Sequence, residues 1–149
     1  MEFQLTQGEM QSMTADQKVA VMESMLMAVL ADGRAEKPEV AEFDAQVERT
    51  PWNLEHAQLK AQMEAARTRV LASAGKGEGE VLRMIGGIAM LLPSIELRQK
   101  VLHSMCSIMA ANDLNLGEKT IVHAFATAFG IPLDRLEAIK ASIKQAKSK

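Results

Sequence analysis

The chain has 149 residues, a formal net charge of −2 at pH 7 and a hydrophobic share of 48%. This length is typical of one compact domain with a single hydrophobic core. The small net charge excludes a protein that is drawn to nucleic acid or anionic lipid by a strong overall field.

The composition favours helix along nearly the whole chain. There is no Tyr, only four Phe and one Trp, but there are 11 Met. Long stretches of Ala, Leu, Met, Glu, Gln and Lys have high helix propensity, and runs of β-branched or aromatic residues are few. We therefore expect an all-α fold: a single domain over residues 1–149, folded as one compact bundle of about seven helices.

The first strong helix is expected over residues 14–31. Residues 1–13 contain no apolar run, so they indicate a loose N-terminal segment without an export signal. Thr14 and Gln17 have the spacing of a capping box, which favours a helix start. A helix this apolar is expected to be mostly buried. Its inner stripe consists of Val19, Met22, Leu26 and Val29.

Two more helices are expected in the first half of the chain. The second begins near Lys37 and Pro38, because Pro is tolerated in a first helical turn. Thr50 is an expected N-cap and Pro51 an expected first residue of the third helix, which runs to about residue 74. Three glycines within residues 75–79 then disfavour helix, so this segment is expected to be a hinge between two halves.

Four helices are expected in the second half, over residues 80–92, 95–111 and 117–129 and from residue 133 onward. Gly86 and Gly87 are interpreted as permitting a close helix crossing, and Ser94 as a helix cap. The expected inward-facing residues are Val81, Ile85, Ile88, Leu92, Leu97, Val101, Met105, Ile108, Ile121, Val122, Phe125, Phe129, Leu136, Ile139 and Ile143.

The two halves share a pattern. With an offset of 81 residues, Asp32 falls on Asp113, and each of these residues follows an apolar, Met-rich helix. The pattern indicates two related helical halves facing each other across a pseudo-twofold axis. Such an arrangement would place the two acidic turns close together or at equivalent edges.

Carboxylates occur at both of these turns. Glu39 follows Asp32 by seven residues, and Glu118 follows Asp113 by five. Ca²⁺ and Mg²⁺ prefer several oxygen ligands, and helix ends expose backbone carbonyls that could join the carboxylates. Asp32, Glu39, Asp113 and Glu118 are therefore our candidate ligands for a divalent ion, Ca²⁺ or Mg²⁺ above all, or for another polar ligand.

The spacing of these carboxylates does not fit an EF-hand loop, because Phe43 and Ala124 stand where the terminal Glu of such a loop is required. The same carboxylates also suit a chain that binds no ligand. In that case Asp32 with the following Gly is a helix stop, and Glu39 and Glu118 are partners of the helix dipole.

The same residues resemble the TerB-like tellurite-resistance family, which is related to the N-terminal helical domain of some membrane-anchored DnaJ-like cochaperones. The resemblance covers about residues 14–146. It implies a two-repeat helical domain with an acidic metal-binding cluster, linked with bacterial stress and phage defence. Leu114 departs from the Gly that is usual in the family after the second Asp. The resemblance is carried by Ala31-Asp32-Gly33 with Glu39, Asp113 with Glu118, and Ala128-Phe129-Gly130-Ile131.

The expected function is a non-enzymatic bacterial stress-response module, similar to tellurite-resistance proteins, that binds a divalent ion or polar ligand. The alternative is a metal-free helical interaction or scaffold domain. We expect no enzyme, because no nucleophile with a base and no phosphate-binding loop is present. The single cysteine, Cys106, is typical of a cytoplasmic protein. Expected partners are an unknown protein or a second copy, without nucleic acid and without a membrane span.

Overall fold

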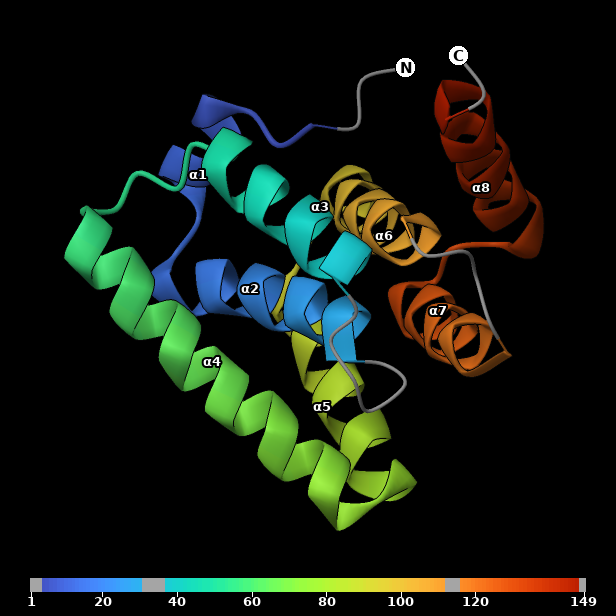
Figure 1. The fold of residues 1–149 in the computed structure, drawn as a ribbon, viewed down its shortest axis with the longest axis horizontal. Coiled ribbons are helices and arrows are strands. Elements are labelled where there is room, and N and C mark those ends of the chain that lie inside the picture. Colours follow the sequence, from blue (N-terminus) through green and yellow to red (C-terminus); the bar gives the residue numbers. More distant parts are fainter. Residues whose placement is uncertain (1–3, 31–36, 112–115, 148–149) are drawn as a thin grey trace.

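The computed structural model describes residues 4–30, 37–111 and 116–147. Within this part every regular element is a helix (Figure 1). The all-α prediction is confirmed, and the compact bundle contains one helix more than expected. The eight described helices are α1 (Gln7–Ser12), α2 (Ala15–Leu30), α3 (Lys37–Arg49), α4 (His56–Lys76), α5 (Glu78–Leu91), α6 (Ile95–Ala110), α7 (Leu116–Phe129) and α8 (Leu133–Lys147).

Helices α2 and α6 form the centre of the bundle. They pack against each other, and α2 also contacts α3, α4 and α5, whereas α6 also contacts α3, α7 and α8. Because α2 is covered from several sides, it buries residues around its whole circumference, as its apolar sequence predicts. The expected inward-facing residues that are buried are Met22, Leu26, Val29, Ile85, Ile88, Leu92, Leu97, Val101, Met105, Ile108, Val122, Phe125, Phe129, Leu136, Ile139 and Ile143.

The N-terminal segment differs from the loose chain that was expected, because it contains helix α1. Thr6 and Glu9 form a capping box: Glu9 N donates to Thr6 Oγ1 over 3.1 Å, and Thr6 N donates to Glu9 Oε1 over 2.9 Å. Met10 is fully buried, and Lys100 Nζ on α6 lies 2.7 Å from Glu9 Oε1. Burial alone would raise the pKa of Glu9, but the hydrogen bonds from Lys100 and Thr6 and the Lys100 charge lower it overall.

The prediction that a helix begins at Pro51 is wrong, because α4 begins only at His56. Trp52 is buried, and its Nε1 donates to Val47 O over 3.0 Å, at the end of α3. Asn53 has a left-handed φ of 58°, which is incompatible with a continuing helix. Thr50 Oγ1 donates back to Gln46 O over 2.6 Å, so Thr50 closes α3 instead of capping α4.

The glycine-rich hinge is reduced to one residue. Helix α4 continues to Lys76 and α5 begins at Glu78, so Gly77 alone separates them. Its φ of 104° and ψ of 176° belong to a region that side chains rarely adopt. The close crossing expected at Gly86 and Gly87 is not observed, since a Cβ at either position would meet no described atom within 4 Å.

Replacing Gly77 by Ala is expected to lower the free energy of unfolding by about 1 to 2 kcal/mol, because a Cβ strains this backbone conformation. Gly87→Ala is the matched control. It lies within α5 with open space at its Cβ, so Ala should raise stability by about 0.5 to 1 kcal/mol. Urea denaturation measures both changes. Equal effects of the two substitutions on the free energy of unfolding would contradict the conclusion that Gly77 alone forms the turn between α4 and α5.

The two halves correspond in part. Helix α2 packs against α3 and α4, and in the same way α6 packs against α7 and α8. The correspondence stops there, because α3 packs on α6 whereas α7 packs on α5 and α6. Helix α6 is therefore the element that the equivalent helices α3 and α7 share.

Candidate functional site

Glu39 is the one predicted ligand whose side chain the structure describes. It lies in the first turn of α3 and has an exposed fraction of 0%. The positive end of the helix dipole favours its charge. A glutamate that serves only the dipole can remain in water, however, and burying a carboxylate is expensive unless its charge is matched. The burial of Glu39 therefore exceeds what capping the helix requires.

The other three predicted ligands are described incompletely. Asp32 and Asp113 lie outside the described residues. Glu118 belongs to the first turn of α7, but its side chain also lies outside the described part. The structure therefore shows the side chain of one predicted ligand, Glu39. That all four side chains lie close together stays a prediction.

Each of the two acidic turns connects a pair of described helices. Helix α2 ends at Leu30 and α3 begins at Lys37, while α6 ends at Ala110 and α7 begins at Leu116. In Figure 1, α2 ends, α3 begins and α6 ends on the same side of the molecule. Because α3 packs directly on α6, the buried Glu39 belongs to a helix that contacts the helix preceding Asp113.

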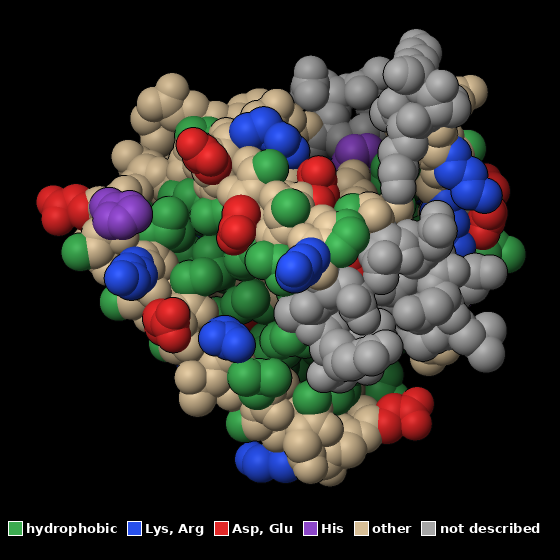
Figure 2. Space-filling view, in the orientation of Figure 1, with side chains coloured by type: hydrophobic (Ala, Val, Ile, Leu, Met, Phe, Trp, Pro, Cys, Tyr) green, Lys and Arg blue, Asp and Glu red, His purple; other side chains and the backbone are tan. Residues whose placement is uncertain are grey.

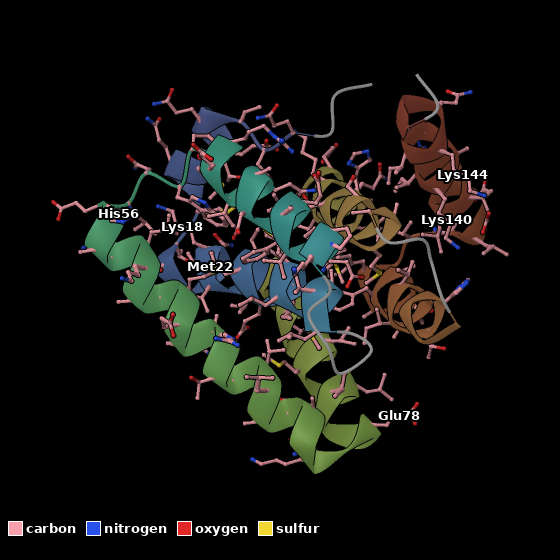
Figure 3. All side chains as sticks on the ribbon, in the orientation of Figure 1. Lys18, Met22, His56, Glu78, Lys140 and Lys144 are labelled. Carbon is pink, nitrogen blue, oxygen red and sulfur yellow. The ribbon has the colours of Figure 1, made fainter. Side chains whose placement is uncertain are left out.

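The histidines belong to no metal-binding cluster within the described part of the chain. Among the side chains of residues 4–30, 37–111 and 120–145, no three from His, Cys, Asp or Glu lie close enough to hold a metal ion. Exposed His56 begins α4, at the opposite edge of the molecule from Lys140 and Lys144 on α8 (Figure 3). His103 on α6 is partly buried, and this burial lowers its pKa. A metal site at the acidic turns therefore stays a prediction.

Cys106 on α6 has the environment of a core residue. It is buried, and this burial is the main reason that its pKa rises to about 12. The charges of Lys140, which lowers the pKa, and Glu137, which raises it, have smaller effects. The thiol is therefore protonated at neutral pH, whereas nucleophilic or metal-binding cysteines react as thiolates.

An ion pair between exposed Arg69 and buried Glu23 lines a cavity that sequence patterns did not predict. Arg69 Nε on α4 lies 2.6 Å from Glu23 Oε2 on α2. The two residues line a cavity of about 420 Å³, together with Met84 and Leu91 on α5. The pair joins positions 46 residues apart, so only the packing of α2 against α4 brings them together.

An apolar groove lies on the face drawn in Figure 2. Hydrophobic side chains gather there between α3 and α4, over α2. Both flanking helices pack against α2. The partly buried hydrophobic residues of these two helices include Val40, Phe43, Val47, Leu59 and Met63.

Comparisons with protein-family models, with curated proteins and with solved structures found no match to this chain. The fold and the candidate site therefore rest on the residues themselves. Among the described helices, none combines the length and the apolar character needed to span a membrane.

Proposed function

We propose that this chain is a non-enzymatic, TerB-like stress-response module of the bacterial cytoplasm. It binds a divalent metal ion through Asp32, Glu39, Asp113 and Glu118. The observation that carries the proposal is the complete burial of Glu39 in the first turn of α3. A carboxylate in that position, next in sequence to an acidic turn, is of the ligand type that hard divalent cations prefer.

The ion best suited to these ligands is Ca²⁺ or Mg²⁺. Both are hard cations that take carboxylate and carbonyl oxygens, and neither requires His or Cys. The last carbonyls of α2 and α6 lie next to the acidic turns in sequence, and backbone carbonyls at helix ends can serve as ligands of such ions. A polar ligand with a positive group would use the same carboxylates.

The proposal predicts that a divalent ion stabilises the protein and that a chelator reverses the effect. Ca²⁺ or Mg²⁺ at a hundredfold excess over its dissociation constant should add about 2.7 kcal/mol to the free energy of unfolding. Thermal denaturation of chelator-treated protein, with and without each ion, measures this gain.

Asp32→Asn combined with Asp113→Asn should abolish the ion effect without unfolding the protein. The matched control is Asp44→Asn combined with Asp134→Asn, which removes the same charge at two exposed positions. The control should keep the full ion effect. If both double variants respond to the ion as the unmodified protein does, the acidic turns are not the site.

The alternative function is a metal-free helical interaction domain. The apolar groove between α3 and α4 favours it, because helical partners commonly insert an apolar face into such grooves (Figure 2). This function predicts a melting temperature that is indifferent to chelator and to Ca²⁺ or Mg²⁺. The thermal experiment above therefore separates the two functions.

A further inference from the structure

A polar pocket lies between α3, α6, α8 and the segment that precedes α1. Its volume is about 310 Å³, near the lower limit for small-molecule sites. Among the described lining residues only Leu5 is apolar, and the rest of the wall carries amide, hydroxyl, imidazole and charged groups. Glu39, the one predicted acidic ligand whose side chain is described, does not belong to this lining.

Gln46 on α3 supplies an unmet acceptor in this wall. The residue is 7% exposed. Its Nε2 donates to Glu42 Oε2 over 2.9 Å and to Ser104 O over 3.4 Å. Because both neighbours are acceptors, they fix the orientation of the amide. Oε1 is then the free end, and it is buried without a hydrogen-bond donor among the described residues. A bound molecule that donates to Oε1 would recover the interaction that burial has cost this oxygen.

Three hydroxyl groups face the same space. Ser104 and Ser107 lie one turn apart on α6, and Ser142 comes from α8. All three residues are partly buried, and within the described part of the chain none of the side-chain hydrogen bonds involves their hydroxyls. Each hydroxyl can donate one hydrogen bond and accept others. The wall therefore offers several uncommitted groups that suit a ligand with alternating donors and acceptors.

The charges of the wall cancel. Arg49 Nη2 lies 3.4 Å from Glu42 Oε2, so the cation and the anion of the described lining already form a pair. Burial lowers the pKa of His103 and so disfavours the charged form of its imidazole. An anionic ligand would meet the Glu42 carboxylate, and a cationic ligand would meet Arg49. The wall thus favours a ligand without net charge.

We propose that this pocket binds a small uncharged molecule rich in hydroxyl groups, of the polyol or simple-sugar class. Gln46 Oε1 accepts a hydrogen bond from a ligand hydroxyl. The hydroxyls of Ser104, Ser107 and Ser142 donate to and accept from the remaining ligand oxygens. This proposal uses none of the residues of the acidic turns, so ion binding and polyol binding can each fail without the other.

Amide-resolved NMR titration of the full chain with mannitol and with glucose tests the proposal. At least one probe should give saturable shifts at the Gln46 side-chain amide and at residues 104, 107 and 142. Inorganic phosphate, as a charged probe, should give none at these positions. Absence of saturable shifts with both mannitol and glucose, or equal shifts with phosphate, would overturn the proposal.

Variants assign the binding to the pocket. Ser104→Ala combined with Ser107→Ala should weaken binding about tenfold or more, because two hydrogen bonds are lost. Ser142→Ala, a milder change on α8, should weaken it about fivefold. Two control variants should leave polyol binding unchanged. One is Ser73→Ala on α4, which lines the cavity beside the Glu23–Arg69 pair. The other combines Asp32→Asn with Asp113→Asn. Undiminished binding in both the double serine variant and Ser142→Ala would overturn the assignment.

Discussion

Replacing Arg98 by Ala should lower the free energy of unfolding by about 3 kcal/mol, because its guanidinium holds together the ends of two helices. Arg98 Nε donates to Leu92 O over 2.7 Å, Nη2 donates to Ala89 O over 2.7 Å, and Nη1 donates to Phe129 O over 3.1 Å. These carbonyls lie at the C-terminal ends of α5 and α7, where the helix dipole also favours a cation.

Arg98→Lys separates the contribution of the guanidinium's shape to stability from the contribution of its charge. Lysine keeps the cation but lacks the planar fork that reaches three carbonyls, so it should recover only part of the lost stability. Urea denaturation at constant pH measures all three proteins. A loss below about 0.5 kcal/mol in Arg98→Ala, the range of an ordinary surface change, would contradict this role.

Phe125→Ala should cost about 3 to 5 kcal/mol, the usual range for truncating a buried aromatic side chain. Phe125 is fully buried. Its ring lies edge-on to that of Phe129, with a centroid separation of 5.5 Å and an interplanar angle of 72°. Such pairs stabilise beyond the area that they bury.

Phe125→Leu is the control for the size of the cavity. Leucine restores most of the buried volume without the ring contact, so it should cost much less than alanine. Calorimetric or fluorescence-detected thermal denaturation compares the variants, with Trp52 as the intrinsic probe. If alanine and leucine cost the same, the site tolerates a cavity and the packing described for α7 is wrong.

The helices could be predicted from the sequence wherever apolar residues recur with helical spacing. Thr14 and Gln17 mark the start of α2 as expected, with Thr14 N donating to Gln17 Oε1 over 2.9 Å. Helix α1 has the same signature in Thr6 and Glu9. It was not predicted because only Met10 and few other apolar residues accompany the motif, and the anchor that holds it, Lys100, is distant in the chain.

The segment between α3 and α4 shows where local pattern fails. Thr50 followed by Pro51 has the composition of a helix start, but the burial of Trp52 decides the outcome. Tertiary packing of a large side chain outweighs a local capping preference of about 1 kcal/mol. Local sequence patterns cannot predict this outcome, because it depends on tertiary contacts of Trp52.

The site was accessible from sequence only in part. The position of Glu39 at a helix start could be predicted, but its complete burial depends on the packing of α3 against α6 and α2. Likewise, the pocket around Gln46 combines residues of α3, α6 and α8 that share no sequence motif. Arg98 joins α6 to the ends of α5 and α7 through hydrogen bonds that the spacing of apolar residues does not predict.

Calorimetric titration of the metal-free protein with Ca²⁺ and Mg²⁺ tests the central claim most directly. The proposed function predicts saturable binding of at least one of these ions, and its loss in the variant that combines Asp32→Asn with Asp113→Asn. Absence of binding heat for both ions, together with a melting temperature unchanged by them, would contradict the claim.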